Sequence, residues 1–330
     1  MPANLTPQYH EAEAKYRAAV TSQEKLDALE EMLAVIPKHK GTEHMRADIK
    51  RRISKIKERD KKLGVAKRGY EFRVEREGAG QIALVGPPNS GKSLLLDRFT
   101  AAEPKVADYP FSTRKPMPGM MEFEDIQIQL VDMPPITPGT SEPWLLAIVR
   151  SADAALIVLD SSSPELLEDL EGAREELATG KILLRGPEQE PPKDLGPSLV
   201  TRPAIIAANK SDLDGADENL STLRDLYGAE MPVVPISAQT GEGLEELKRS
   251  LFDLLGIIRV YTKVPGKPPD IQRPFTLPRG STLLDLAIQV HHDFAQRFKF
   301  ARAWGKGKPD GVMIGRDYVF EDKDIVELHA

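Results

Sequence analysis

The chain has 330 residues, of which 40% are hydrophobic and 29% are charged, and it contains no cysteine. This length allows two or three domains with cores of ordinary size, and the composition is that of a globular protein. The lack of cysteine excludes disulfide bonds and thiolate metal sites. Because the sequence has neither a signal-peptide pattern nor an apolar run long enough to span a membrane, we expect a cytoplasmic protein.

The net charge of −6 conceals a basic segment near the N-terminus. Residues 38–68 hold 13 Lys and Arg against 4 Asp and Glu, a local balance of +9, which leaves −15 for the rest of the chain. A basic arm on an acidic body suggests a polyanionic partner, most simply RNA, but a solvated charged helix face explains the same residues equally well. Since aromatic residues are not interleaved with them, these side chains would contact phosphates rather than read bases.

Residues 1–69 are predicted to form a helical hairpin whose second helix is basic. The first helix follows a capping box from Thr21 to Glu24, and the second begins near Thr42, after a proline and a glycine that break the chain. Apolar residues recur at helical spacing in both helices. They are Leu26, Leu29, Leu33 and Ile36 in the first helix, and Met45, Ile49, Ile53 and Ile56 in the second.

Residues 70–256 alternate between short apolar strands and helical stretches. The predicted strands include "QIALVG", "IQIQLVD", "AALIVLD" and "PAIIAANK", and the helices include "SLLLDRFTA" and "LEELKRSLFDLLG". This order predicts an α/β domain with a mostly parallel sheet that helices cover on both faces. Residues 180–203 are rich in proline and glycine and are predicted to be a surface excursion between two strands.

Residues 257–330 have a different pattern, with segments that read in turn as strand, strand, helix, strand and strand. The segments are "IIRVYTKV", "RPFTLPRG", "TLLDLAIQVHHDF", "GVMIGRDYVF" and "DIVELHA". They predict a separate small α+β domain, which at about 75 residues is large enough to fold alone.

The octet "GPPNSGKS", residues 86–93, satisfies the phosphate-loop pattern G-x-x-x-x-G-K-[ST] between a strand and a helix. In such a loop, main-chain amides surround the phosphates, the lysine adds a positive charge, and the final serine offers an oxygen to Mg²⁺. A glycine turn beside a surface lysine would be the alternative, but an octet with these flanks is uncommon by chance. The expected nucleotide-binding residues are Gly86, Pro87, Pro88, Asn89, Ser90, Gly91, Lys92 and Ser93.

Asp132 ends the strand "IQIQLVD", 40 residues beyond Lys92. A carboxylate at that place can hold a water molecule of Mg²⁺, as the Walker-B aspartate does. Its alternative role is that of a helix cap or turn residue. With the phosphate loop present, we predict that Ser93 and Asp132 bind the metal.

The tetrapeptide "NKSD", residues 209–212, follows the strand "PAIIAA" and predicts a guanine site. The carboxylate of Asp212 can accept hydrogen bonds from the ring N–H and the exocyclic amine of guanine, whereas adenine would leave it unpaired. Ser237 and Ala238, after the strand "VVPI", complete the predicted base pocket, together with Asn209 and Lys210. Phosphate-loop kinases and ATPases have no reason to carry this motif.

These motifs, with "ADYPFSTRKPMPG" and "SAQTGEGLEEL", resemble the Obg-type GTPases. The helices before them and the segments after residue 257 resemble the developmentally regulated GTP-binding protein (DRG-like) branch, with a C-terminal TGS domain, a ubiquitin-like β-grasp fold found in ribosome- and tRNA-associated proteins. The resemblance implies GTP and GDP as ligands, Mg²⁺, and ribosomes or small proteins as partners, with no membrane or DNA partner. Those relatives carry a folded insertion in the GTPase domain, for which residues 180–203 are too short.

The resemblance also implies two further site residues. Thr113 would ligate Mg²⁺ in the triphosphate state, although a threonine in a proline-rich loop is usually a turn residue. Asn89 matches Obg-like loops that hold a potassium ion near the β- and γ-phosphates, but it could equally stiffen the loop through a hydrogen bond. Lys92, Thr113 and Asn89 are therefore the candidate catalytic residues.

Pro135 stands where a guanine-nucleotide switch has a glycine whose N–H binds the γ-phosphate. Proline has no N–H, so a charge-assisted hydrogen bond of about 1.5–3 kcal/mol cannot form. A loss of that size weakens the preference for GTP over GDP about tenfold or more, unless Thr113 carries the discrimination alone. Ile136 follows, where Ras-like proteins have a glutamine that orients water, and Obg-type relatives also carry an apolar residue there.

Three functions are compatible with these residues. We predict a guanine-nucleotide switch that binds GTP and GDP and hydrolyses GTP slowly unless potassium or a partner assists it. The first alternative is a nucleotide-binding scaffold that barely hydrolyses. The second is an RNA or ribosome adaptor in which the nucleotide is a structural ligand.

Overall fold

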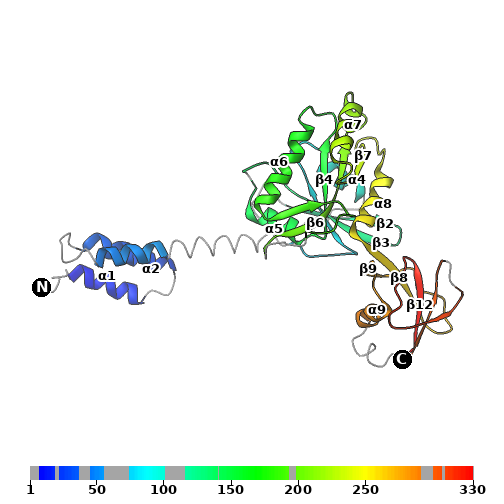
Figure 1. Ribbon diagram of the computed structural model, residues 1–330. Helices are drawn as coiled ribbons and strands as arrows, with labels where there is room; N and C mark the ends of the chain where they lie inside the picture. The colour runs from blue at the N-terminus through cyan, green and yellow to red at the C-terminus, as the bar shows by residue number, and fades with distance from the viewer. Residues whose placement is uncertain are drawn as a thin grey trace. The chain divides into compact units, whose positions relative to one another are not determined.

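The structure is a computed structural model, and it describes residues 7–18, 22–36, 45–55, 74–100, 116–139, 141–192, 198–290, 300–306 and 309–329. The chain divides into two compact units, Met1–Glu71 and Phe72–Ala330. Figure 1 shows the elements of both units along the chain. None of the helices described is long and apolar enough to cross a membrane.

The first unit contains helices α1 (Pro7–Ala18) and α2 (Ser22–Val35) and a further helical segment at residues 45–55. Helical segments are therefore present in both predicted regions, but α1 precedes them, so the described residues of the unit form three helical segments and not two. The sequence pattern missed α1 because its buried positions hold an aromatic and a small residue instead of an aliphatic stripe. The core of the unit consists of Tyr9, Ala12, Leu29, Met32, Ile36 and Ile49.

Several N-terminal predictions fall outside the described residues. They are the cap at Thr21, the break before the second helix, the start of that helix at Thr42, Ile56, and most of the basic residues beyond position 55.

The second unit begins with a seven-stranded sheet in the order β2-β3-β1-β4-β6-β5, with β7 paired to β6. Strands β1, β3, β4, β5, β6 and β7 run parallel to one another, and β2, at the edge, pairs antiparallel with β3. This confirms the prediction of an α/β domain with a mostly parallel sheet. The strands are β1 Gln81–Val85, β2 Met117–Phe123, β3 Ile126–Asp132, β4 Ala154–Asp160, β5 Ile182–Arg185, β6 Val200–Asn209 and β7 Val233–Pro235.

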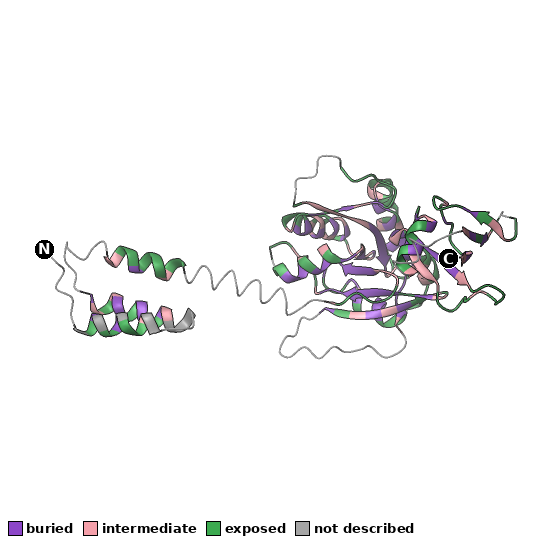
Figure 2. Cartoon of the chain, turned by 90° about the horizontal axis from the view of Figure 1, so that it is seen from below, coloured by how far each residue is buried: buried purple, intermediate pink, exposed green. Residues whose placement is uncertain are grey.

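Helices cover both faces of this sheet, whose central strands are buried along their length (Figure 2). Helices α4 (Lys92–Phe99) and α8 (Leu244–Leu255) pack on one face, and α5 (Pro143–Ser151), α6 (Leu166–Thr179) and α7 (Ala216–Tyr227) pack on the other. Because the carboxyl ends of parallel strands meet at one edge, the loops after β1, β3, β4, β6 and β7 come together there.

Two strands of this sheet were not predicted. Strand β2 contains Pro118 and Gly119, residues that usually argue against a strand. The sheet tolerates both residues because β2 lies at its edge. Strand β5 lies within residues 180–203, the predicted surface excursion, where Ile182 and Leu184 are buried against α5 and α6. That segment therefore contributes a short strand, and residues 193–197 within it are outside the described part.

The C-terminal part of the unit forms a separate five-stranded sheet in the order β11-β10-β12-β8-β9, with α9 packed on it. The prediction lacked β10, whose buried positions are Ala301 and Ala303 and not large apolar residues. The elements are β8 Ile257–Lys263, β9 Phe275–Pro278, α9 Leu283–Val290, β10 Phe300–Trp304, β11 Val312–Ile314 and β12 Asp324–His329.

A buried arginine connects the two sheets of this unit. The side chain of Arg259, on β8, is 2% exposed and forms ion pairs with Glu124 and Asp125, in the β2–β3 turn, and with Asp322, before β12. The N–O distances are 2.6, 2.7 and 2.7 Å, and the guanidinium also lies 4.8 Å from the ring centre of Phe252. The Arg259 charge is thus fully paired in spite of its burial.

The same cluster perturbs the acids around it. Hydrogen bonds from Lys323 and Arg259 lower the pKa of Glu124 to about 2. The hydroxyl of Tyr261 donates to Asp125 at 2.6 Å, which adds a neutral donor to the ionic contacts. The β2–β3 turn and the C-terminal sheet are therefore held together by charge-assisted hydrogen bonds.

Candidate functional site

Gly91, in the loop between β1 and α4, has a backbone conformation that only glycine can adopt. Its φ is 93°, and a Cβ atom there would lie 2.2 Å from Nδ2 of Asn209. Asn89 also has a positive φ, of 60°, a conformation that asparagine adopts more readily than most residues. Residues 86–93 thus form the tight turn into a helix N-terminus that the phosphate-loop pattern predicts.

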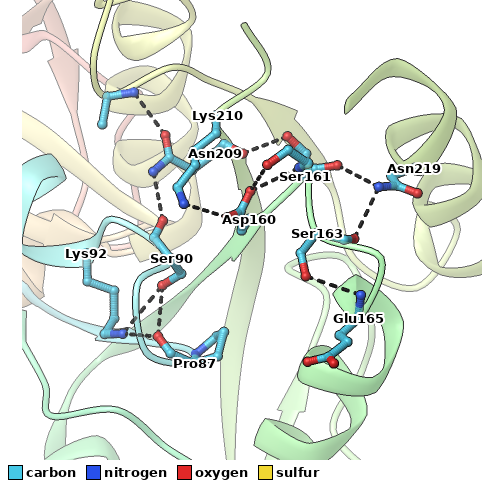
Figure 3. Close-up of polar contacts among 12 residues, drawn as sticks. Pro87, Ser90, Lys92, Asp160, Ser161, Ser163, Glu165, Asn209, Lys210 and Asn219 are labelled. Atoms are coloured by element: carbon cyan, nitrogen blue, oxygen red, sulfur yellow. Dashed lines mark hydrogen bonds and ion pairs between the residues drawn. The ribbon is translucent and has the colours of Figure 1, made fainter. Parts of the chain in front are cut away.

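Lys92 is buried at the start of α4 and points back into this loop (Figure 3). Its ammonium donates to the carbonyl oxygens of Gly86 at 3.1 Å and Pro87 at 2.6 Å, and it lies 3.4 Å from Oγ of Ser90. Burial lowers the pKa of Lys92 to about 8, although the charge of Asp132 opposes the shift. The loop therefore holds a positive charge inside the curl of its own backbone, where phosphate oxygens are expected.

Ser93 and Asp132, the two predicted metal ligands that the structure describes, meet beside the loop. The Ser93 hydroxyl donates to Oδ2 of Asp132. The other carboxylate oxygen, Oδ1, is buried and has no hydrogen-bond partner among the described residues, and burial raises the pKa of Asp132. An orphaned carboxylate oxygen next to a hydroxyl is a donor set that suits Mg²⁺.

The described part of the chain offers such an ion no cluster of further acidic ligands. Within the described residues, no cluster of three or more His, Cys, Asp or Glu could hold a metal. Mg²⁺ usually keeps several waters and takes phosphate oxygens, so one carboxylate and one hydroxyl fit it. Thr113, the third predicted ligand, lies outside the described residues.

Asn209 joins the phosphate loop to the predicted base pocket. Its side chain is buried, its Nδ2 donates to the carbonyl of Ser90 at 2.8 Å, and its Oδ1 accepts from the amide of Ala238 at 2.9 Å. The Ser237 hydroxyl accepts from the amide of Thr240 at 3.0 Å, which closes the loop after β7. Residues from three loops are therefore fixed relative to one another.

Lys210 is held by a residue that the sequence reasoning did not identify. Its Nζ pairs with Oδ2 of Asp160 at the end of β4, and the amide of Ser162 donates to the other oxygen at 3.0 Å (Figure 3). Burial alone would raise the pKa of Asp160, but the hydrogen bonds from Lys210 and Ser162 outweigh it, so the pKa lies below its ordinary value. The sequence held a signal for Asp160, because β4 ends in a carboxylate just as β3 ends in Asp132.

Asp212 is exposed after β6 and makes no hydrogen bond with the described residues. It is thus available to a ligand at the edge of the sheet that carries the phosphate loop. Asn89 is exposed as well, and its side chain makes no hydrogen bond with the described residues. Its role as a potassium ligand therefore stays a prediction.

The loop after β3 turns its apolar residue inward. Pro135 is exposed, whereas Ile136 is 2% exposed in the core under α5 and α6, and its amide donates to the carbonyl of Gly86 at 3.1 Å. The buried carboxylate of Glu176, on α6, accepts from the amides of Gly139 at 2.7 Å and Ser141 at 3.2 Å. Ile136 therefore cannot orient a water molecule in this arrangement, and its amide already has a partner.

Two family models match parts of the chain. Residues 81–185 match the family described as a 50S ribosome-binding GTPase. Residues 258–330 match the TGS domain.

Proteins of similar sequence align with nearly the whole chain. An uncharacterized GTP-binding protein of Methanocaldococcus jannaschii is 29% identical over 370 residues, which cover 93% of this chain and 92% of the relative. Developmentally-regulated G-protein 1 of Arabidopsis thaliana is 27% identical, with 92% and 90% covered. Developmentally-regulated GTP-binding protein 1 of Xenopus laevis is 26% identical, with 92% and 98% covered.

The first of these alignments is longer than the 330 residues of this chain. The relative therefore has segments without a counterpart here, and the expected lack of an insertion in the GTPase domain stays a prediction.

Proposed function

We infer the function of this chain from its kinship with the DRG-type GTP-binding proteins, and from its GTPase and TGS domains. We propose that it binds GTP and GDP with Mg²⁺ and hydrolyses GTP slowly. The observation that carries the proposal is the carboxamide of Asn209, which ties the phosphate loop to the loop after β7 while Asp212 stays available beside them. A single ligand that carries both phosphates and a purine base could bind the phosphate loop and Asp212 at the same time.

We assign the phosphates to the loop of residues 86–93 and the base to Asp212, Ser237 and Ala238. Lys92 would exchange its bonds to loop carbonyls for bonds to phosphate oxygens. Asn209 and Lys210 would hold the pocket in shape. Mg²⁺, when bound, would neutralise charge on the phosphates, with Ser93, Asp132 and, in the triphosphate state, Thr113 as its protein ligands.

Replacing the carboxylate of Asp212 by an amide tests this proposal. In Asp212→Asn, the amide group offers one donor and one acceptor, which suits the N1–H and 2-oxo group of xanthine but not the two donors of guanine. We expect affinity for GDP to fall at least about a hundredfold and affinity for XDP to rise. Calorimetry with GDP, XDP and ADP measures both changes.

Asp214→Asn is the matched control, since Asp214 is an exposed carboxylate in the same loop. It should bind GDP as the unmodified chain does. Equal heats for GDP and ADP in the unmodified chain would contradict guanine binding altogether.

Slow hydrolysis follows from the loop after β3. Neither Pro135, which has no amide hydrogen, nor Ile136, whose amide is engaged with Gly86, can serve the γ-phosphate as described. We propose that potassium held by Asn89, or a partner, supplies the missing stabilisation. Single-turnover hydrolysis should then be faster in potassium than in sodium, and Asn89→Ala should remove the difference. A rate no higher than that in water in either salt would instead favour the scaffold function.

Restoring an amide at position 135 tests the sensor argument. In Pro135→Gly we expect the ratio of GTP to GDP affinity to rise about tenfold, the equivalent of one charge-assisted hydrogen bond. Competition binding with both nucleotides measures the ratio. Pro134→Gly loosens the same loop without placing an amide at position 135, so it should leave the ratio unchanged; an equal rise in both variants would mean that flexibility, and not the amide, is responsible.

A ribosome or RNA partner is a second proposal, and the basic helical segment at residues 45–55 supports it. Ile49 is buried in the core of the first unit, whereas Lys50, Arg51 and Lys55 are exposed. A ribosome-binding description also belongs to the family that matches residues 81–185. A small protein is the alternative partner, and we expect the location to be cytoplasmic.

Replacing Lys50, Arg51 and Lys55 by alanine tests the RNA proposal in the full chain. If these side chains contact phosphates, the slope of log affinity against log salt for a short single-stranded RNA should become shallower by about 2. Arg224→Ala, an exposed arginine on α7, should not change the slope. An unchanged slope in the triple variant would favour the protein partner.

A further inference from the structure

The side chain of Arg98 links two parts of the nucleotide site that are 140 residues apart in sequence. Arg98 lies in the last turn of α4, the helix that begins at Lys92. Its Nε donates to the carbonyl of Ala238 at 3.0 Å, and its Nη2 donates to the carbonyl of Gln239 at 2.6 Å. A single guanidinium therefore holds two successive carbonyls of the predicted base loop.

This grip determines the direction of one amide. The carbonyl of Ala238 and the N–H of Gln239 belong to the same peptide group, and no peptide bond described is cis. In a trans peptide the two groups point in opposite directions. Because Arg98 binds the carbonyl from the side of α4, the N–H of Gln239 is directed away from that helix.

The same amide is the donor that this loop leaves available. Within the described residues, the N–H of Gln239 has no hydrogen-bond partner. The other amides of residues 236–242 all have one, and their acceptors are Ala208 O for Ile236, Glu242 O for Ser237, Asn209 Oδ1 for Ala238, Ser237 Oγ for Thr240, Ser237 O for Gly241 and Thr240 Oγ1 for Glu242. Among the amides of residues 236–242, only that of Gln239 thus has no partner in the described part of the chain, and it belongs to the peptide that Arg98 holds.

We propose that Arg98 is a positioning residue for purine recognition, which aims the Gln239 amide at the 6-oxo group of guanine. Guanine carries an acceptor at that position, and adenine carries an amine. A charged donor on the carbonyl polarises the peptide, so the N–H at its other end becomes a stronger donor. This inference rests on the proposed function and adds to it a residue outside the guanine motif that contributes to base selection.

Changing both the arginine and the base atom tests this inference. The full chain and its Arg98→Ala variant are each titrated with GDP and with 6-thio-GDP, whose sulfur is a weaker acceptor than oxygen. We expect the unmodified chain to prefer GDP about tenfold or more. In Arg98→Ala, GDP binding should weaken about tenfold and 6-thio-GDP binding much less, so that the ratio of affinities approaches one.

Two further variants keep the experiment interpretable. Arg98→Lys retains a charge but cannot reach both carbonyls with a fixed fork, so its ratio should lie between those of the other two proteins. Arg224→Ala removes an exposed arginine from α7 and should leave the ratio unchanged. Thermal unfolding of each variant verifies that it is folded.

The possible outcomes separate the two proposals. Equal weakening of both ligands in Arg98→Ala, with the ratio unchanged, would mean that Arg98 only tethers the loop, and it would overturn this inference alone. An unmodified chain that binds GDP no better than ADP would overturn the proposed function and this inference with it.

Discussion

The side chain of Asn209 is the constraint on which the rest of the site depends. Its carboxamide donates to the phosphate loop at Ser90 and accepts from the loop after β7 at Ala238, and it does both while fully buried. Loss of either partner would leave a buried polar group unpaired, which costs about 1–3 kcal/mol. Gly91 must be glycine because any Cβ atom would occupy the position of Nδ2. Two sequence motifs, 119 residues apart, are therefore parts of one rigid arrangement.

The local part of the site could be predicted from sequence, whereas its long-range supports could not. In the phosphate loop and in the tetrapeptide "NKSD", the residues expected to bind the ligand lie in a single turn of the backbone. Their spacing in the sequence is therefore fixed, and a short motif is enough to identify them. Arg98, Asp160 and Glu176 act on loops that come from distant strands. Nothing near each of these side chains in the sequence indicates its partner, since the partner is set by the order of strands in the sheet.

The same limit applies to the fold. Continuous apolar runs predicted the central strands, because a strand buried on both faces carries apolar residues on both faces. Helix α1 and strand β10 bury alanines and a tyrosine, which carry little pattern. Strand β2 contains a proline and a glycine, and its position at the edge of the sheet, which only the assembled topology reveals, makes them acceptable. The apolar pattern thus predicts elements that bury large aliphatic side chains better than elements that bury small ones or lie at the edge of a sheet.

The cluster around Arg259 has a consequence for how strain could pass through the second unit. Strand β3 runs from the turn that Arg259 grips to Asp132, the carboxylate beside Ser93, and seven residue pairs hold β2 against it. This ribbon is a continuous connection, so a displacement of the whole of β3 would have to break the ion pairs of Arg259 or move the C-terminal sheet with it. If a cation binds at Asp132 as proposed, and its binding displaces β3, then by thermodynamic reciprocity a ligand of the C-terminal sheet would change the affinity for that cation.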